Sequence, residues 1–331
     1  MSLFAAINYH YVRDHFQAPY PAIFGQTPAE LATQVKELMT IARPAGQKEL
    51  LEIIHTGKMP RTNTFFITFD DGLKEQYHQA LPVLESLGVP ALFFVNSLPL
   101  AESVVMTVHK IHILRSQINP VTLSRDLFEI LAEIGINLNP EEDLRKARTA
   151  YRYDTPEQAS IKYLLNYFLD STVKDRVVNL LFDRFFPGEE ATISEELYMG
   201  EKELKSLAEK GFLACHSHAH HALGKLSKNE QEKDIALNKQ WIESATGVEM
   251  KGFSYPYGSQ EACENVGEVL KRNGFTFAFT MERAINHEIG DPFYLSRFDT
   301  NDVPLGKSYP YRTEEMFEKF PAKTWTFPTY A

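Results

Sequence analysis

The sequence is poor in cysteine, has no long apolar run and carries no excess of positive charge. Its 331 residues include only two cysteines, Cys215 and Cys263, which are too few for a disulfide framework. No stretch of about 18 apolar residues predicts a membrane span. Acidic residues outnumber basic ones, and the formal net charge of −10 disfavours a general nucleic-acid binder or a protein of anionic membrane surfaces.

The first residues lack the features of a secretory signal. Residues 1–10 contain no basic n-region and no long apolar h-region, so we expect a cytoplasmic protein. The composition, with 44% hydrophobic and 24% charged residues, is typical of a soluble globular protein. The length allows one large α/β domain or two smaller ones.

One stretch, Thr64–Gly72, combines a strand pattern with two carboxylates. Its apolar, β-branched and aromatic run predicts a buried strand, and Asp70 and Asp71 follow at the carboxyl end, where α/β sheets place their ligands. Adjacent strand residues point to opposite sides, so the two acids serve one role only if the chain bends, which Gly72 permits. At this point a simple strand-ending turn remains an equal alternative.

Strand and helix patterns alternate along much of the chain. Together they predict a parallel sheet with crossover helices. The predicted strands are 3–12, 64–69, 91–96, 212–215, 252–255, 275–280 and 293–298, and the predicted helices are 27–42, 77–87, 201–210, 227–245 and 263–272.

The middle of the chain has a different character. Residues 98–199 show helical patterns and almost no strand signal, so we expect a helical insertion or lid there. The sheet would then be built from 1–97 and 200–306. The remaining tail, 307–331, is aromatic and contains proline, and we expect it to lie over the surface.

A second group of functional residues is a histidine cluster, with four histidines between positions 216 and 221. His216 and His220 are four apart, and in a helical turn they would share a face that suits two imidazoles on one ion. Two neutral imidazoles and a carboxylate form a ligand set with open positions, as in hydrolytic metal sites. Such a set favours Zn²⁺, although other divalent ions fit it; the alternative is a solvated polar loop.

Other histidines and one cysteine are predicted to have lesser roles. His109 and His112 are three apart on a predicted helix, and we expect them at the surface rather than in a second metal site. His218 and His221 are expected to flank the first site. Cys215 precedes His216 on a strand and therefore points the opposite way.

Three motifs together resemble the polysaccharide deacetylase family, also called the NodB-homology or carbohydrate esterase 4 family. They are Thr68-Phe-Asp-Asp-Gly72, His216-Ser-x-x-His220 and Phe253-Ser-Tyr-Pro-Tyr-Gly258. The resemblance is to a variant form with circularly rearranged members. It covers the predicted sheet, leaves the helical insertion unmatched, and implies a distorted, seven-stranded (β/α) barrel. The implied activity is metal-assisted hydrolysis of an N-acetyl amide, or sometimes an O-acetyl ester, on a sugar.

The resemblance also implies residue roles. Asp71, His216 and His220 would hold the metal, and Asp70 would be the general base for the attacking water. The backbone N–H of Tyr257 would help to stabilise the oxyanion.

Two positions depart from the usual family pattern. Ser254 stands where the family usually has an arginine that orients the base, and Arg297 is our candidate replacement, although a surface arginine is as plausible. The late histidine motif is missing, but some rearranged relatives carry that strand first, as a Tyr-His pair. By that resemblance His10 would be the general acid, with Asp299 or Asp302 as its partner; otherwise it is a packed strand-end histidine.

The leading hypothesis is a metal-dependent enzyme that removes an N-acetyl group from an amino sugar or glycan intermediate. The alternatives are a deformylase or another amide hydrolase with the same metal site, or a non-catalytic carbohydrate-binding relative. Asp70 favours an enzyme, because a binding protein needs no base. The helical insertion favours a small or lipid-linked sugar over a polymer.

Overall fold

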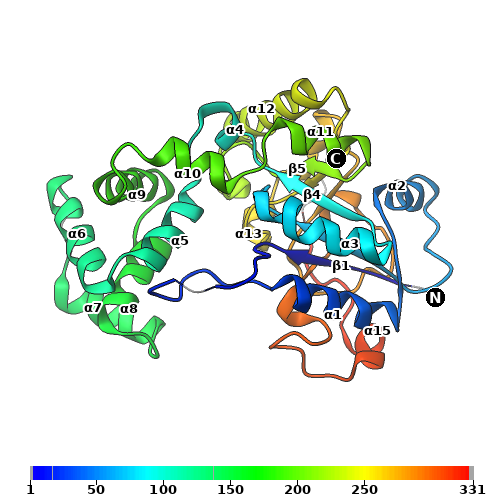
Figure 1. Cartoon of the computed structure of the whole chain (residues 1–331), viewed down its shortest axis with the longest axis horizontal. Helices are drawn as coiled ribbons and strands as arrows, with labels where there is room; N and C mark the ends of the chain where they lie inside the picture. The colour runs from blue at the N-terminus through cyan, green and yellow to red at the C-terminus, as the bar shows by residue number, and fades with distance from the viewer. Residues whose placement is uncertain (1–2, 17, 137, 328–331) are drawn as a thin grey trace. The chain divides into compact units, whose positions relative to one another are not determined.

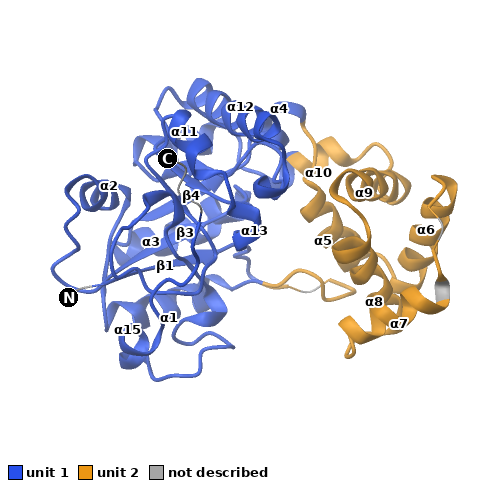
Figure 2. Cartoon of the chain, turned by 180° about the vertical axis from the view of Figure 1, so that it is seen from behind, with its two compact units in different colours: residues 1–14, 25–102, 195–331 blue, residues 15–24, 103–194 orange. Residues whose placement is uncertain are grey.

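The computed structural model describes residues 3–16, 18–136 and 138–327. The chain forms two compact units, unit 1 with residues 1–14, 25–102 and 195–331, and unit 2 with residues 15–24 and 103–194 (Figures 1 and 2). The sequence-based division differs chiefly at 15–24, which were placed with the sheet.

Unit 1 is built on a parallel sheet, as predicted. All of its strand pairs are parallel, and the order is β7-β6-β5-β4-β3-β1-β8, with β2 beside β3. The first strand therefore lies between β3 and the last strand. The strands are β1 (Phe4–Tyr9), β2 (Arg43–Pro44), β3 (Thr64–Phe69), β4 (Ala91–Val95), β5 (Leu213–Cys215), β6 (Gly252–Ser254), β7 (Phe277–Phe279) and β8 (Phe298–Asp299).

The two ends of this sheet meet through the segment that leads into β8. The N–H of Leu295 donates to Ala278 of β7 over 2.9 Å, and the Leu295 carbonyl accepts from Thr280 over 2.8 Å. Three residues later, Phe298 pairs with Ile7 of β1. The sheet therefore curls into a distorted barrel with surrounding helices, which confirms the predicted fold class.

Strand alternation gives the barrel an outer and an inner layer. On β3, Phe65, Ile67 and Phe69 belong to the large core under the helices, whereas Phe66 belongs to a separate core with Phe94 and Phe279. Residues two apart on a strand share a face, so Thr68 and Asp70 follow Phe66 on the inner side. The interior is thus apolar at one level and polar at the carboxyl ends of the strands.

Most helices of unit 1 cover the outer face, whereas Leu50 and Ile53 of α2 pack in the inner core with Phe66. Capping boxes at Thr27/Glu30 and Ser227/Glu230 start α1 and α12, as the sequence predicts. In both views α1 and α3 lie along β1 (Figures 1 and 2). Helix α2 was not predicted, and a π-helical turn begins the helix predicted at 77–87. The elements are α1 (Pro28–Met39), α2 (Gln47–Thr56), η1 (Gln76–Ala80), α3 (Leu81–Leu87), α4 (Leu98–Glu102), α11 (Glu201–Glu209), α12 (Lys228–Thr246), α13 (Gln260–Cys263), α14 (Gly267–Arg272) and α15 (Met316–Lys319).

The C-terminal tail contributes to the core rather than only covering the surface. Met316 and Phe317 of α15, together with Phe320, are buried in the large core. The Phe320 ring packs on the Phe298 ring of β8, with 4.6 Å between the centroids.

Unit 2 is helical, and its described residues contain no strand. Its elements are α5 (Thr107–Gln117), α6 (Pro120–Glu133), α7 (Pro140–Ala150), α8 (Pro156–Tyr163), η2 (Leu164–Phe168) and α9 (Ser171–Phe185), and α10 (Glu190–Leu197) begins in it. In the part of the chain that the structure describes, no helix is both long and apolar enough to span a bilayer.

The expected surface position of His109 is wrong. Its side chain is fully buried, while His112 is partly buried with its ring centroid 6.1 Å away. The reason is that α5 packs against both α6 and α9, which covers its polar positions as well. Lys110 is buried on the same helix, where its Nζ pairs with Glu190.

Candidate active site

The two carboxylates after β3 are separated by a sharp bend. Asp70 remains on the inner side of the strand, whereas Asp71 takes a left-handed conformation with φ of 78° and Gly72 follows with φ of 65°. A side chain at Gly72 would place its Cβ 2.8 Å from a Val95 methyl group, so the bend requires glycine. The bend directs Asp70 and Asp71 to different partners.

Asp71 meets His216 and His220. Its Oδ1 lies 3.5 Å from His216 Nε2 and 3.2 Å from His220 Nε2, and all three side chains are buried. One ligand atom from each residue lies within 4.8 Å of the others. Three buried ligand atoms from strand ends far apart in sequence thus converge on one point.

Neighbouring groups determine which nitrogen His216 presents. His216 follows β5, and its Nδ1 lies 2.7 Å from the carbonyl oxygen of Ser254 at the end of β6. A carbonyl only accepts, so Nδ1 carries a proton, and in the neutral ring Nε2 is the nitrogen left to bind a metal. The hydrogen bond therefore favours the tautomer that a metal ligand needs.

The loop between the two histidines is not the helical turn considered above. Ser217 and His220 take left-handed φ values of 66° and 57°. Asp234 of α12 holds the loop, because its carboxylate accepts the N–H groups of His218 over 2.8 Å and of Ala219 over 3.1 Å. The histidines converge through this loop geometry rather than through helical periodicity.

The cluster fits a divalent cation. One carboxylate oxygen and two imidazole nitrogens form a set that suits Zn²⁺ and related ions. Burial would lower the pKa of His216, but the negative charges of Asp70 and Asp71 outweigh it and raise that pKa. The same carboxylates that favour a protonated imidazole also favour a metal cation at this point.

Asp70 is held by Arg297. Arg297 Nη1 donates to Asp70 Oδ1 over 2.8 Å and Nη2 donates to Oδ2 over 2.6 Å. Arg297 is fully buried, so it is not a surface residue, and it also donates to Ser254 Oγ over 2.8 Å and to Asn8 Oδ1 over 3.1 Å. The guanidinium that orients Asp70 therefore lies next to Asn8 of β1 and also donates to the hydroxyl of Ser254.

The environment keeps Asp70 ionised. Burial opposes ionisation, but the charges of Arg297 and His216 outweigh it and lower the pKa of the Asp70 carboxyl. Asn8 Nδ2 donates to Asp70 Oδ2 over 3.0 Å, and that oxygen lies 3.9 Å from His216 Nε2. An anionic carboxylate therefore stands directly beside the candidate ligands.

Tyr257 borders the same site. It follows Pro256 in a turn, with φ of 62°, and its side chain is half exposed. Its ring centroid lies 5.0 Å from that of His220. The turn after β6 thus reaches the histidine that contacts Asp71.

His10 follows β1 beside the end of β3. Gln76 donates to the carbonyl oxygens of both His10 and Asp70, over 2.9 and 2.5 Å. The two expected carboxylate partners of His10 have other partners: Asp299 accepts from Asn301, and Asp302 pairs with Arg283 over 3.1 Å. The role of His10 stays a prediction.

Sequence reasoning missed several residues that position this site. Asn8 could have been found, because it lies two residues before His10 on the same side of a predicted strand. Gln76 and Asp234 lie on helices, and their positions relative to the strand ends carry no local signal. Ser254 was noted only as a departure, although its hydroxyl bonds to Arg297.

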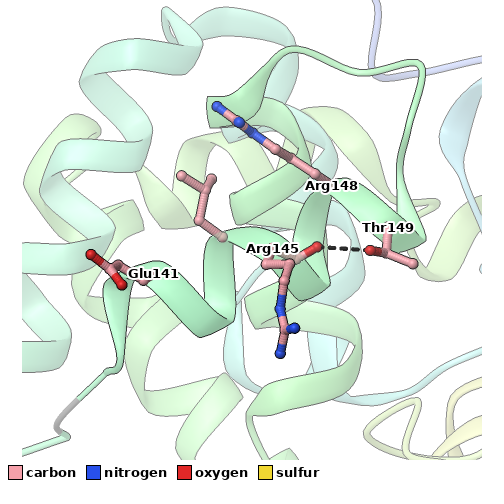
Figure 3. Close-up of a pocket in the computed structure, with 5 residues that line it drawn as sticks. Glu141, Arg145, Arg148 and Thr149 are labelled. Atoms are coloured by element: carbon pink, nitrogen blue, oxygen red, sulfur yellow. Dashed lines mark hydrogen bonds between the residues drawn. The ribbon is translucent and has the colours of Figure 1, made fainter.

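A pocket on α7 of unit 2 contains none of the candidate metal ligands described above (Figure 3). Its lining residues all belong to one helix, and Thr149 donates to the carbonyl oxygen of Arg145 within it. They are Glu141, Leu144, Arg145, Arg148 and Thr149.

The fold and the site together define a curled (β/α) barrel protein with a cation-binding set at the carboxyl ends of its strands. A model of the polysaccharide deacetylase family matches residues 57–117 and 167–278, more than half of the chain. The chain therefore belongs to the polysaccharide deacetylase family. No curated protein sequence matches it.

Solved structures share the fold over nearly the whole chain. The de-N-acetylase from Aggregatibacter actinomycetemcomitans is 15% identical, with a TM-score of 0.56, and the match covers 95% of this chain and 99% of that one. The Streptococcus pyogenes deacetylase PplD is 13% identical, with a TM-score of 0.53 and coverage of 90% and 92%. IcaB from Ammonifex degensii is 15% identical, with a TM-score of 0.50 and coverage of 90% and 91%. At these identities the similarity establishes the fold alone.

Proposed function

We propose that this protein is a metal-dependent deacetylase that hydrolyses the N-acetyl amide of an amino sugar. The observation that carries the proposal is the position of Asp70. This ionised carboxylate is held by Arg297 and lies 3.9 Å from His216, one of the three candidate ligands. A carboxylate kept off the cluster but next to it is what a general base requires.

Asp71, His216 and His220 would hold the ion, and their donor set favours zinc. A divalent ion bound there would polarise the acetyl carbonyl and lower the pKa of a water molecule toward about 7. The hydrogen bond from Nδ1 to Ser254 keeps His216 in the ligand tautomer, and Asp234 keeps the loop in register.

Asp70 would accept a proton from the attacking water. Arg297 and Asn8 fix both carboxylate oxygens and maintain the negative charge at neutral pH. The water oxygen forms a bond to the acetyl carbon, and the proton moves to Asp70. This arrangement would separate the proton acceptor from the residues that bind the cation.

Two further groups would complete the reaction. The backbone N–H of Tyr257 would donate to the carbonyl oxygen as it gains negative charge. His10 would donate a proton to the amide nitrogen as the C–N bond breaks, so that acetate and a free amine leave. Gln76 donates to the carbonyl oxygens of both His10 and Asp70, which supports the closeness of these two residues.

Membership of the polysaccharide deacetylase family supports a carbohydrate substrate. Two of the solved structures that share the fold are described as a deacetylase and a de-N-acetylase. We propose an N-acetylated amino sugar. The expectation of a small sugar rather than a polymer is tested with N-acetylglucosamine oligosaccharides of increasing length, for which we expect rates to fall with length.

The proposal is tested by acetate release from N-acetylglucosamine oligosaccharides and from the matching N-formyl compounds. We expect acetate release that chelation abolishes and Zn²⁺ restores. Asp183→Asn, an exposed acid on α9, serves as the matched control and should keep full activity. Release of formate without acetate would replace this proposal with a deformylase, and no product from any substrate would refute it.

A further inference from the structure

The C-terminal segment 322–327 runs beside the turn that carries Tyr257. That turn, residues 255–260, follows β6. Gln260 Nε2 donates to the carbonyl oxygen of Thr326 over 3.2 Å, which joins the end of the turn to the tail directly. Two further sets of contacts connect the tail with the middle and the beginning of the turn.

Glu282 links the tail to the middle of the turn. This glutamate is almost fully buried, and its Oε1 accepts the N–H groups of Thr324 and Trp325, the latter over 2.8 Å. The preceding residue, Met281, donates its N–H to the carbonyl oxygen of Gly258 over 2.8 Å. Glu282, whose side chain anchors the tail, therefore directly follows Met281, whose backbone N–H closes the turn.

Stacked aromatic rings link the tail to the beginning of the turn. The Phe327 ring lies parallel to the Tyr294 ring at 3.8 Å, and Tyr294 lies parallel to Tyr255 at 6.1 Å. Tyr255 is buried and immediately precedes Pro256. Lys323 Nζ also donates to the carbonyl oxygen of Tyr294.

The turn needs such support because its conformation is unfavourable. Tyr257 and Gly258 both have left-handed backbones, with φ of 62° and 60°. A non-glycine residue keeps a left-handed conformation only where the surrounding structure holds it. Gly258 is also pressed against Met281, since an added Cβ would lie 2.8 Å from the Met281 nitrogen.

We propose that segment 322–327 is a strap that holds the Tyr257 turn in its active conformation, with Glu282 as the positioning residue that anchors it. The catalytic consequence rests on the proposed function, in which the Tyr257 N–H stabilises the oxyanion. The mechanical link between the strap and the turn does not depend on that function.

The link is tested by hydrogen–deuterium exchange of the full-length protein. Glu282→Leu removes the acceptor for both tail amides, and we expect exchange in peptides spanning 255–260 to rise at least tenfold. Peptides spanning 64–72 should not change. Glu282→Gln is the matched control, because Oε1 remains an acceptor and Oε2 makes no hydrogen bond among the described residues. Unchanged exchange at 255–260 in Glu282→Leu would overturn the proposal.

A second variant covers the case in which Glu282→Leu does not fold. Phe327→Ala removes the partly buried ring that stacks on Tyr294, and we expect the same local rise in exchange. With an N-acetylglucosamine oligosaccharide, Glu282→Leu and Phe327→Ala should both lose at least tenfold in kcat, with KM and zinc content within twofold of the parent. The control Glu282→Gln should keep the parental kcat. A rise in exchange without a loss of kcat would overturn the positioning role. An inactive parent protein would refute the proposed function, while the exchange result would still decide the link.

Discussion

Arg297 binds both carboxylate oxygens of Asp70, at 2.8 and 2.6 Å, although the two residues are 227 positions apart in the chain. Both are buried, and the pair reaches across β1, since Asp70 immediately follows β3 and Arg297 immediately precedes β8, the two strands that flank β1. The last strand pairs with the first one, so this arrangement depends on the position of β1 between β3 and β8. The orienting arginine is therefore a consequence of the barrel topology.

Loss of the Arg297 side chain should destabilise the protein strongly. Arg297→Met leaves Asp70 as an uncompensated buried charge, which costs about 3–5 kcal/mol of unfolding free energy. Arg297→Lys keeps the charge but loses the two-point contact, so we expect a smaller loss. Urea unfolding measures both effects, with Arg125→Lys on the exposed face of α6 as the control. Equal stability of Arg297→Met and the parent would contradict the pairing.

The same pair should make stability depend on pH. The folded pKa of Asp70 is lowered below its ordinary value of 3.8, so its ionisation stabilises the folded state. This contribution is complete above the unfolded pKa and is lost as pH falls through the folded pKa. In chelator-treated protein, the stability difference between the parent and Asp70→Asn should be constant near neutral pH and shrink below about pH 4. A difference that grows on acidification would show the opposite sign.

The metal ligands should be separable from their neighbours in the same loop. We expect Asp71→Ala, His216→Ala and His220→Ala to lose the ion, because each removes one of three ligand atoms. His218→Ala is the matched control, since its Nδ1 lies 2.8 Å from Ser97 Oγ rather than in the cluster. Elemental analysis after dialysis against zinc gives the result. Zinc retained by His216→Ala, or lost by His218→Ala, would show that the proposed ligand assignment is wrong.

Asp234 should affect metal affinity without contacting the ion. Its carboxylate accepts the N–H groups of His218 and Ala219, so Asp234→Ala leaves both without their acceptor. We expect zinc affinity to fall by about 10–100-fold, as for other residues that support metal ligands. Competition with a chromophoric chelator measures this. A partly buried acid on the same helix, Glu232, pairs with Arg272 and Asn273 rather than with the loop, so Glu232→Gln is the control variant and should keep the parental affinity.

The His10 side chain should increase the rate of hydrolysis only for substrates with a poor leaving group. As a proton donor to the departing amine it contributes on the order of 10²-fold to amide hydrolysis. An activated aryl acetate needs no such proton, so His10→Ala should lose activity on the sugar amide and keep most of it on the ester. A parallel loss on both substrates would indicate a structural role at the end of β1.

Much of the fold follows from local sequence patterns. The apolar runs of β1, β3 and β4 predict buried parallel strands, and the capping boxes at Thr27 and Ser227 predict where α1 and α12 begin. Helix α2 was missed because its N-terminal cap, Gly46, makes no side-chain hydrogen bond and gives no start signal. His109 was misplaced because its burial depends on two neighbouring helices rather than on its own periodicity.

The candidate site was predicted only as far as its motifs reach. Asp70, Asp71, His216 and His220 stand out by their residue types, and the structure brings them together. Arg297 was named only as a candidate for the arginine that Ser254 replaces, because its own surroundings in the sequence give no signal of burial; that burial results from its place inside the barrel. The supports Gln76 and Asp234 act through helices whose packing no short pattern specifies.

The most direct test of the account is the rate of acetate release by Asp70→Asn loaded with zinc, compared with the parent at equal zinc content. Asp70 is not one of the candidate ligands, so the variant should bind one equivalent of zinc. As the general base is absent, it should release acetate from N-acetylglucosamine oligosaccharides at least about 10²-fold more slowly. A variant that binds one equivalent of zinc and releases acetate at the parental rate would contradict the division of roles between Asp70 and Asp71.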